Sequence, residues 1–147
     1  MSLSSFFVRR FSRLLRSSCR LVNGKGEELG HLEIGTLGER IAAAYLRGHG
    51  RKILYRNFKT HRGGEVDIVA RDGKVLTFVE VKTRTSEEFG RPLEAVDRRK
   101  QSLIRRGANE WLRLLGTREV PWRFDVVEVV LSDGEKPKLN VVENVFD

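Results

Sequence analysis

One predicted β-hairpin constrains the fold of this chain more than any other feature. Residues 64–84 read GEVDIVARDGKVLTFVEVKTR, in which apolar and polar residues alternate on both sides of Asp72 and Gly73. Asp-Gly is a preferred sequence for a two-residue type I′ turn, because both turn positions need a positive φ. Such a turn pairs Arg71 with Lys74 and thereby sets the register of the two strands.

This register brings acidic side chains together on one face of the hairpin. Asp67 and Glu80 become diagonal neighbours, about 7–8 Å apart at the backbone. Because side chains alternate with a period of two, Glu65 and Lys82 share their face. The opposite face is expected to be the core, and it carries Val66, Ile68, Ala70, Val75, Val79 and Val81.

Carboxylates that share one face repel each other, so a compensating positive charge is expected. Mg²⁺ prefers oxygen ligands and keeps several waters, which suits Asp67, Glu80 and the backbone carbonyl of Val81. Mn²⁺ is the alternative ion. Spacing alone leaves a second interpretation open, in which this is the solvated face of a hairpin and Lys82 offsets Glu80.

The rest of the chain predicts an α-β-β-β-α-β-β order. A first helix is expected over residues 35–50, where Thr36 and Glu39 have capping-box spacing. A second helix is expected from residue 92 to about 115, with Gly116 as its stop signal. The remaining strands are predicted at residues 51–60, 123–131 and 139–146. The apolar stripe of the first helix is predicted to comprise Leu37, Ile41, Ala44, Tyr45 and Gly48.

Charge divides the 147-residue chain into a basic N-terminal arm with its linker, residues 1–31, and one domain, residues 32–147. Six of the eight net positive charges lie within residues 1–26, which contain no acid. Such an arm suits nucleic acid, an anionic membrane surface, an organellar transit peptide or a solubilising tail. A lone cysteine, Cys19, favours a reducing compartment such as the cytoplasm, and no stretch is apolar enough to span a membrane.

The amino-acid sequence around the hairpin is similar to that of one protein family. The runs LGERIAAAYL, NFKTHRGGEVDIVARDG, FVEVKTR, FGRPLEAVDRRK and RFDVV resemble the bacterial YraN family, an endonuclease-like group of the PD-(D/E)XK superfamily that is related in fold to archaeal Holliday-junction resolvases. The resemblance runs from about Gly35 to the C-terminus. It implies an α/β fold with a restriction-endonuclease-like αβββαβ core, in which helices flank a mixed sheet, and a nucleic-acid substrate.

The resemblance also implies roles for individual residues. Asp67 and Glu80 would hold the metal at the scissile phosphate, and Lys82 would orient or help to deprotonate the attacking water. Glu39 is the fourth catalytic candidate, because a glutamate on this helix completes the site of junction resolvases. Its alternative role is in the capping box at the start of the helix. A proline is absent before the aspartate, where Val66 stands, but that position varies in the superfamily.

Basic residues beside the site are candidates for nucleic-acid contacts. Lys100 falls inside the apolar stripe of the second helix, so its side chain must either snorkel or reach a carboxylate or phosphate at the site, and the resemblance to the YraN family favours the second. Arg98, Arg99, Arg105, Arg106 and Arg113 are expected on the exposed face of that helix. The predicted contacts with nucleic acid are made by Lys100, Arg84, Arg98, Arg99, Arg9, Arg10 and Arg13.

Three functions fit these observations. The first is a metal-dependent endonuclease that hydrolyses DNA phosphodiester bonds. The second is a nucleic-acid-binding module with weak or no catalysis, and the third is a structural partner protein with an acidic surface cluster. The intact set of Asp67, Glu80 and Lys82 favours the first. The resolvase likeness further implies a homodimer. Asp125 is interpreted as a structural or strand-edge carboxylate rather than a ligand.

Overall fold

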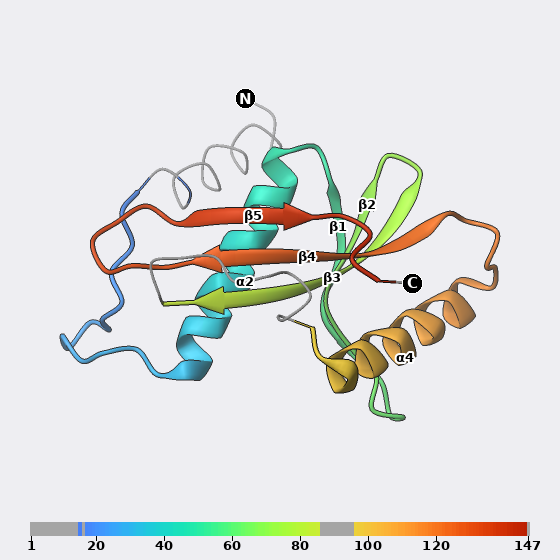
Figure 1. Ribbon diagram of the computed structural model, residues 1–147, viewed down its shortest axis with the longest axis horizontal. Coiled ribbons are helices and arrows are strands. Elements are labelled where there is room, and N and C mark those ends of the chain that lie inside the picture. Colours follow the sequence, from blue (N-terminus) through green and yellow to red (C-terminus); the bar gives the residue numbers. More distant parts are fainter. Residues whose placement is uncertain (1–14, 16, 86–95, 147) are drawn as a thin grey trace.

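The predicted order of helices and strands is confirmed. The computed structural model describes residues 15, 17–85 and 96–146, and Figure 1 shows their arrangement. The elements are α2 (His31–Gly48), β1 (Lys52–Lys59), β2 (Glu65–Asp72), β3 (Val75–Arg84), α4 (Arg98–Leu115), β4 (Trp122–Val130) and β5 (Lys138–Val142). The second helix ends as predicted, with Gly116 at φ 82° as its C-cap. The last strand ends at Val142, four residues earlier than expected.

The five strands form one mixed sheet in the order β1-β2-β3-β4-β5. β3 and β4 run parallel, whereas the other neighbouring pairs are antiparallel. A parallel pair needs a long crossover connection, and α4 lies in that connection. The run from α2 to β4 is therefore the expected αβββαβ core of a restriction-endonuclease-like α/β fold.

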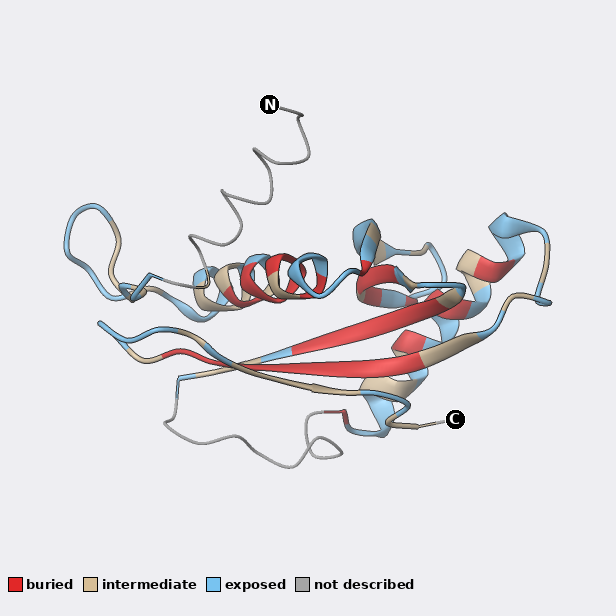
Figure 2. Ribbon diagram, turned by 90° about the horizontal axis from the view of Figure 1, so that it is seen from above, coloured by how far each residue is buried: buried red, intermediate tan, exposed pale blue. Residues whose placement is uncertain are grey.

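Both faces of the sheet are covered, which disagrees with the alternative interpretation of a solvated hairpin face. One cluster packs Ile68 and Val79 against Ile41 and Leu46 of α2. A second packs Val69 and Phe78 against α4, although these two residues share the face of Asp67 and Glu80. Figure 2 shows buried residues along the central strands and on parts of both helices. The face that carries Asp67 and Glu80 therefore also contributes Val69 and Phe78 to the hydrophobic core.

Helix α2 begins earlier than expected. Its N-cap is Gly30, whose N–H donates to the Glu33 carboxylate over 2.8 Å. Thr36 lies inside the helix, where its hydroxyl donates to the Leu32 carbonyl at 2.8 Å. The capping-box prediction for Thr36 and Glu39 is therefore wrong, because an earlier acidic residue caps the helix.

The buried stripe of α2 also differs from the predicted one. The buried residues are Gly38, Ile41, Ala42, Ala43, Ala44 and Leu46, whereas Leu37 and Tyr45 are only half-buried. A Cβ on Gly38 would stand 1.8 Å from the Thr83 hydroxyl, so this glycine sets the close approach of α2 to β3. Small residues therefore lie beside the larger Ile41 and Leu46 on the side of this helix that meets the sheet.

The hairpin register differs from the prediction by two residues. Asp72 pairs with Val75 and Arg71 with Leu76, so the turn residues are Gly73 and Lys74. Since side chains alternate with a period of two, a shift of two leaves Asp67, Glu80 and Lys82 on one face. Val66 departs from the predicted faces, because it packs in the cluster of Val69 and Phe78 instead of with Ile68 and Val79. The next pair after Ile68 and Val79 in this register is Asp67 with Glu80, which makes them direct rather than diagonal neighbours.

Residues 19–29 contact the domain. The Cys19 N–H donates to the Glu135 carbonyl, and the Leu21 N–H donates to the Asp133 carboxylate over 2.7 Å. These bonds join part of the segment assigned to the arm and linker to the turn between β4 and β5. The arm residues Arg9, Arg10 and Arg13 lie outside the described residues. Within the described part of the chain, none of the helices is both long and apolar enough to cross a membrane.

Candidate active site

Asp67 and Glu80 lie side by side on the central strands of the sheet. The Asp67 carboxylate accepts a hydrogen bond from the Val81 N–H at 2.8 Å, which fixes it against β3. A side-chain hydrogen bond also joins Asp67 to Glu80. Two carboxyl groups can bond in this way only when one of them carries a proton. The pair therefore shares a proton or requires another positive charge.

Glu80 is almost completely buried, with 5% of its surface exposed. Burial, followed by the negative charge of Asp67, raises the pKa of Glu80 to about 8. The ammonium of Lys100, 3.2 Å from the Glu80 carboxylate, lowers that pKa but does not offset the other two effects. As the helical spacing predicts, Lys100 reaches from the start of α4 to a carboxylate of the site.

Neighbouring carboxylates stabilise the positive charge of the Lys100 ammonium. Burial lowers its pKa, but the carboxylates of Glu80, Asp67 and Glu65 raise it, and the net change is upward. Its ammonium therefore stays protonated at neutral pH and acts as a fixed cation among three acids. Glu65 itself is exposed at the start of β2.

Glu39 approaches the same site from α2. Its pKa is raised by burial and by the Asp67 carboxylate, whereas Lys100 lowers it. Because Glu39 lies more than one turn beyond the start of α2, it has no capping role there. Of its two interpretations, only the one that places it at the site agrees with the structure.

A cavity of about 190 Å³ opens onto these groups. Glu39, Glu80, Lys82 and Lys100 line it together with His31, Ile34, Gly35, Val81 and Thr83. Lys82 is exposed at its mouth, next to the buried Glu80 in sequence. His31 is exposed at the first position of α2 and also lines this cavity.

Asn57 is a site residue that no pattern in the sequence indicates. It is one of two non-glycine residues with a positive φ among those described, at 54°, a conformation that asparagine tolerates better than most residues. Its side chain hydrogen-bonds to Glu39 and lowers the pKa of that residue. In the register of β1 with β2, it falls opposite Asp67. Asn57 therefore holds the Glu39 carboxylate of α2 from the strand next to Asp67.

The predicted nucleic-acid contacts occupy different environments. Arg98 and Arg99 are exposed on the first turn of α4, and Arg105, Arg106 and Arg113 are exposed further along it, as the helical projection predicts. Arg84 is half-buried at the end of β3, and within the described residues its Nε has no hydrogen-bond partner. Arg98 and Arg99 are thus free to meet a ligand beside Lys100.

The donor set suits a hard divalent cation with water ligands. In the described ranges, no three side chains of histidine, cysteine, aspartate or glutamate lie close enough to form a complete metal cage. Asp67 and Glu80 supply adjacent carboxylate oxygens, and both feel a repulsion that a cation would relieve. Mg²⁺ is usually bound by one or two protein carboxylates and several waters, whereas a structural zinc site is closed by four protein ligands.

Comparison with known proteins identifies the family. The profile of the "Uncharacterised protein family UPF0102" matches residues 38–129. A UPF0102 protein of Trichlorobacter lovleyi is 48% identical over 84% of this chain and 94% of its own length. The chain belongs to the UPF0102, or YraN, family. UPF0102 proteins of Geobacter metallireducens and Chlorobium limicola are 46% and 41% identical, each over 78% of this chain.

The UPF0102 match contains every candidate catalytic residue. Glu39, Asp67, Glu80, Lys82 and Lys100 all lie within residues 38–129. The basic arm and the strand β5 lie outside it. The site therefore belongs to the part of the chain that defines the family, whereas the arm does not.

The raised pKa of Glu80 predicts that metal-free protein loses stability as pH rises. Below about pH 8 folded Glu80 holds a proton, whereas in the unfolded chain it releases that proton above about 4.5. The folded state therefore binds more protons between these values, and the free energy of unfolding falls with pH by up to about 1.4 kcal/mol per unit. Urea unfolding in EDTA at pH 5–8.5 measures this decline. Glu80→Gln should flatten it, and parallel curves for both proteins would contradict the assignment.

Asn57→Gly is expected to raise the pKa of Glu39 further without unfolding the protein. Glycine adopts the φ of 54° readily, so only the amide and its hydrogen bond are removed. NMR titration of the Glu39 carboxyl group measures the effect. Asn144→Gly is the matched control, since Asn144 has the same φ at the other end of the chain. An unchanged Glu39 titration in Asn57→Gly would show that the amide does not position this carboxylate.

Proposed function

We propose that this UPF0102 protein is a metal-dependent endonuclease that hydrolyses DNA phosphodiester bonds. The observation that carries the proposal is the convergence of two carboxylates and two lysines at one cavity, beside which Asp67 pairs with Glu80. Asp67 and Glu80 come from neighbouring strands, and Glu39 comes from α2. Lys82 and Lys100 line the same cavity as Glu39 and Glu80. Paired carboxylates with an adjacent lysine suit hydrolysis of a phosphodiester.

Each group has a task in this proposal. Asp67 and Glu80, with the Val81 carbonyl, would hold Mg²⁺ or Mn²⁺, which when bound stabilises the negative charge that develops on the phosphate. Lys82 at the cavity mouth orients the attacking water by donating hydrogen bonds. Lys100 neutralises Glu80 and lies where a phosphate oxygen can approach. Burial and the Asp67 carboxylate raise the pKa of Glu39, so it takes up a proton more readily than an exposed glutamate. Water adds to phosphorus, and the bond to the leaving sugar oxygen breaks.

Divalent metal should raise the melting temperature of the protein. The reason is that a cation bound only to the folded state stabilises it by mass action. Thermal melts with EDTA, Mg²⁺ and Mn²⁺ measure the rise, which should be a few degrees at saturating metal. Asp67→Asn with Glu80→Gln should abolish it. Equal metal stabilisation of wild type and the double variant would remove these two residues as ligands.

A cleavage screen tests the proposed activity. Duplex, single-stranded, flapped and four-way DNA are incubated with the protein and Mg²⁺ or Mn²⁺. Metal-dependent products from any of them support the nuclease. DNA binding without products would instead indicate a binding module, and neither binding nor cleavage would indicate a structural partner protein. Salt-dependent affinity separates the last two functions.

We further propose a substrate, a location and an assembly for this protein. Its substrate is DNA, its location is the cytoplasm, and a homodimer is its expected assembly, as for the resolvases that the family resembles. Sedimentation of the purified protein with and without DNA measures that assembly.

A further inference from the structure

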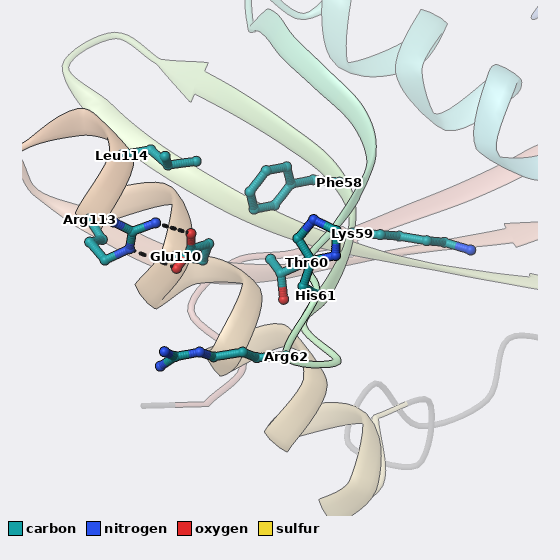
Figure 3. A pocket seen from close by; sticks show the side chains of 8 residues that line it. All are labelled: Phe58, Lys59, Thr60, His61, Arg62, Glu110, Arg113 and Leu114. Atoms are coloured by element: carbon teal, nitrogen blue, oxygen red, sulfur yellow. Dashed lines mark hydrogen bonds and ion pairs between the residues drawn. The ribbon is translucent and has the colours of Figure 1, made fainter.

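A second and larger cavity lies between the β1–β2 turn and the C-terminal half of α4. Its volume is about 540 Å³, within the range of small-molecule sites. Figure 3 shows Phe58, Thr60 and His61 on the side of β1 and its turn, and Glu110, Arg113 and Leu114 on the side of the helix. Lys59 extends away from α4 in this view. None of the candidate catalytic residues lines this cavity.

The two walls are held together by facing glycines. A Cβ on Gly64 would stand 2.5 Å from the Gly107 backbone nitrogen, and one on Gly107 would stand 2.6 Å from a Val66 methyl group. The turn is closed by backbone bonds between Thr60 and Gly64, and the Thr60 hydroxyl accepts from the Gly64 N–H at 2.8 Å. The turn and the helix that form the cavity walls can therefore approach this closely only because both positions are glycine.

The walls have two chemical characters. Phe58 and Leu114 supply apolar surface, and Leu114 is 63% exposed. Arg62 is exposed on the turn, and Arg113 donates through Nε and Nη2 to the Glu110 carboxylate. Two guanidinium groups against one carboxylate leave an excess positive charge. An aromatic and aliphatic wall beside a cation matches a nucleobase and its phosphate.

The position of this cavity relative to the active site also suits a nucleotide of a bound DNA strand. Gly107 separates the two sites along α4, with Lys100 on one side and Glu110 and Arg113 on the other. At a rise of 1.5 Å per residue, 10–13 residues span about 15–20 Å. Phosphates of one DNA strand recur about every 3.4 Å in a duplex and lie further apart in an extended single strand. A strand held at Glu80 can therefore reach the cavity within about six nucleotides.

We propose that this cavity binds one unpaired nucleotide of the substrate strand, with its base against Phe58 and Leu114 and a phosphate on Arg62. The inference rests on the proposed function, because the substrate strand is the one held at Asp67 and Glu80. It specifies the substrate class as DNA with a single-stranded segment near the cleavage position. A fully paired base, stacked inside a duplex, would not present its face to this wall.

Exposed residues allow a test with little effect on folding. The probes are fluorescent flap oligonucleotides in EDTA, each with one abasic site at a successive position of the single-stranded arm. Wild-type protein should lose roughly 5- to 100-fold in affinity at one position, the range for one stacked base. Leu114→Ser should weaken binding of the intact flap and remove the abasic effect at that position. Leu115→Ser is the matched control, because Leu115 is exposed but does not line the cavity.

The phosphate contact has its own measurement. Arg62→Ala should lower the slope of log affinity against log salt by about 0.7, the value for one single-strand phosphate. Arg71→Ala, an exposed arginine at the far end of β2, should leave the slope unchanged. If no abasic position matters, or if it matters equally in Leu114→Ser, the proposal is overturned even where cleavage is observed. A position-dependent base effect without any cleavage would support this site while the nuclease proposal fails.

Discussion

Lys82→Ala is expected to slow single-turnover DNA cleavage by roughly 10²–10⁴-fold, the range for a lost acid–base group. Lys82 is exposed at the mouth of the cavity that Glu39 and Glu80 line, and it makes no ion pair with the described residues. Its removal therefore takes away a group that faces the substrate, and not a salt bridge of the fold. DNA affinity and the melting temperature in Mg²⁺ should change little.

Lys74→Ala is the matched control for this prediction. Lys74 is an exposed lysine in the turn between the same two strands, away from the cavity. Its loss should leave cleavage unchanged. A Lys82→Ala protein that folds, binds DNA and cleaves at the parental rate would contradict the proposed role. Loss of stability alone would instead support the interpretation that Lys82 offsets Glu80.

Asp125→Ala is expected to destabilise the protein by about 3–5 kcal/mol, since it leaves a buried guanidinium without its main partner. The Asp125 carboxylate is 1% exposed and accepts from Arg51 at 2.8 Å, from Arg123 at 3.0 Å and from the Asn144 N–H at 3.0 Å. Arg51 precedes β1 and is itself buried. This carboxylate thus joins the start of β1, the strand β4 and the C-terminal segment.

Urea unfolding at pH 7 in EDTA measures this loss. Asp133→Ala is the control, because it removes only exposed contacts: an ion pair with Arg20, which contributes about 1 kcal/mol or less, and the hydrogen bond from the Leu21 N–H. A cost for Asp125→Ala no greater than that of the control would show that the Arg51 contact does not stabilise the fold. The result also tests the interpretation of Asp125 as structural. β4 lies inside the sheet, so the strand-edge alternative is wrong.

The sequence predicts the order of elements and the faces of the hairpin because both depend on periodicity. Alternation with a period of two identifies which residues share a face, and an error of two residues in the register does not alter it. Asp67, Glu80 and Lys82 were therefore assigned to one face correctly, although the turn proved to be Gly73 and Lys74. The alternation of side chains could not predict whether Asp67 and Glu80 are direct or diagonal neighbours, because the position of the turn decides this.

Features that depend on packing between distant segments were not predictable. The face of Asp67 is covered by α4 through Val69 and Phe78, a contact that alternation within one hairpin does not specify. The role of Asn57 depends on its positive φ and on α2 crossing near β1. Glu39 had a local explanation in the sequence, the capping box with Thr36, which disappears once Glu33 caps the helix. For Glu39, the local capping-box pattern led to an incorrect interpretation, because the contact that caps the helix comes from Glu33.

The central claim is that Asp67 and Glu80 form a metal-dependent nuclease site, and cleavage by matched variants tests it most directly. Wild type, Asp67→Asn and Asp133→Asn are incubated with a flapped DNA under single-turnover conditions while Mg²⁺ or Mn²⁺ is titrated. Asp133 is an exposed aspartate at the turn beyond β4 and does not line the site cavity. We predict metal-dependent cleavage by wild type and Asp133→Asn, and none by Asp67→Asn, although all three proteins bind the DNA. Equal cleavage by all three would contradict the account, as would folded wild-type protein that binds DNA and never cleaves it.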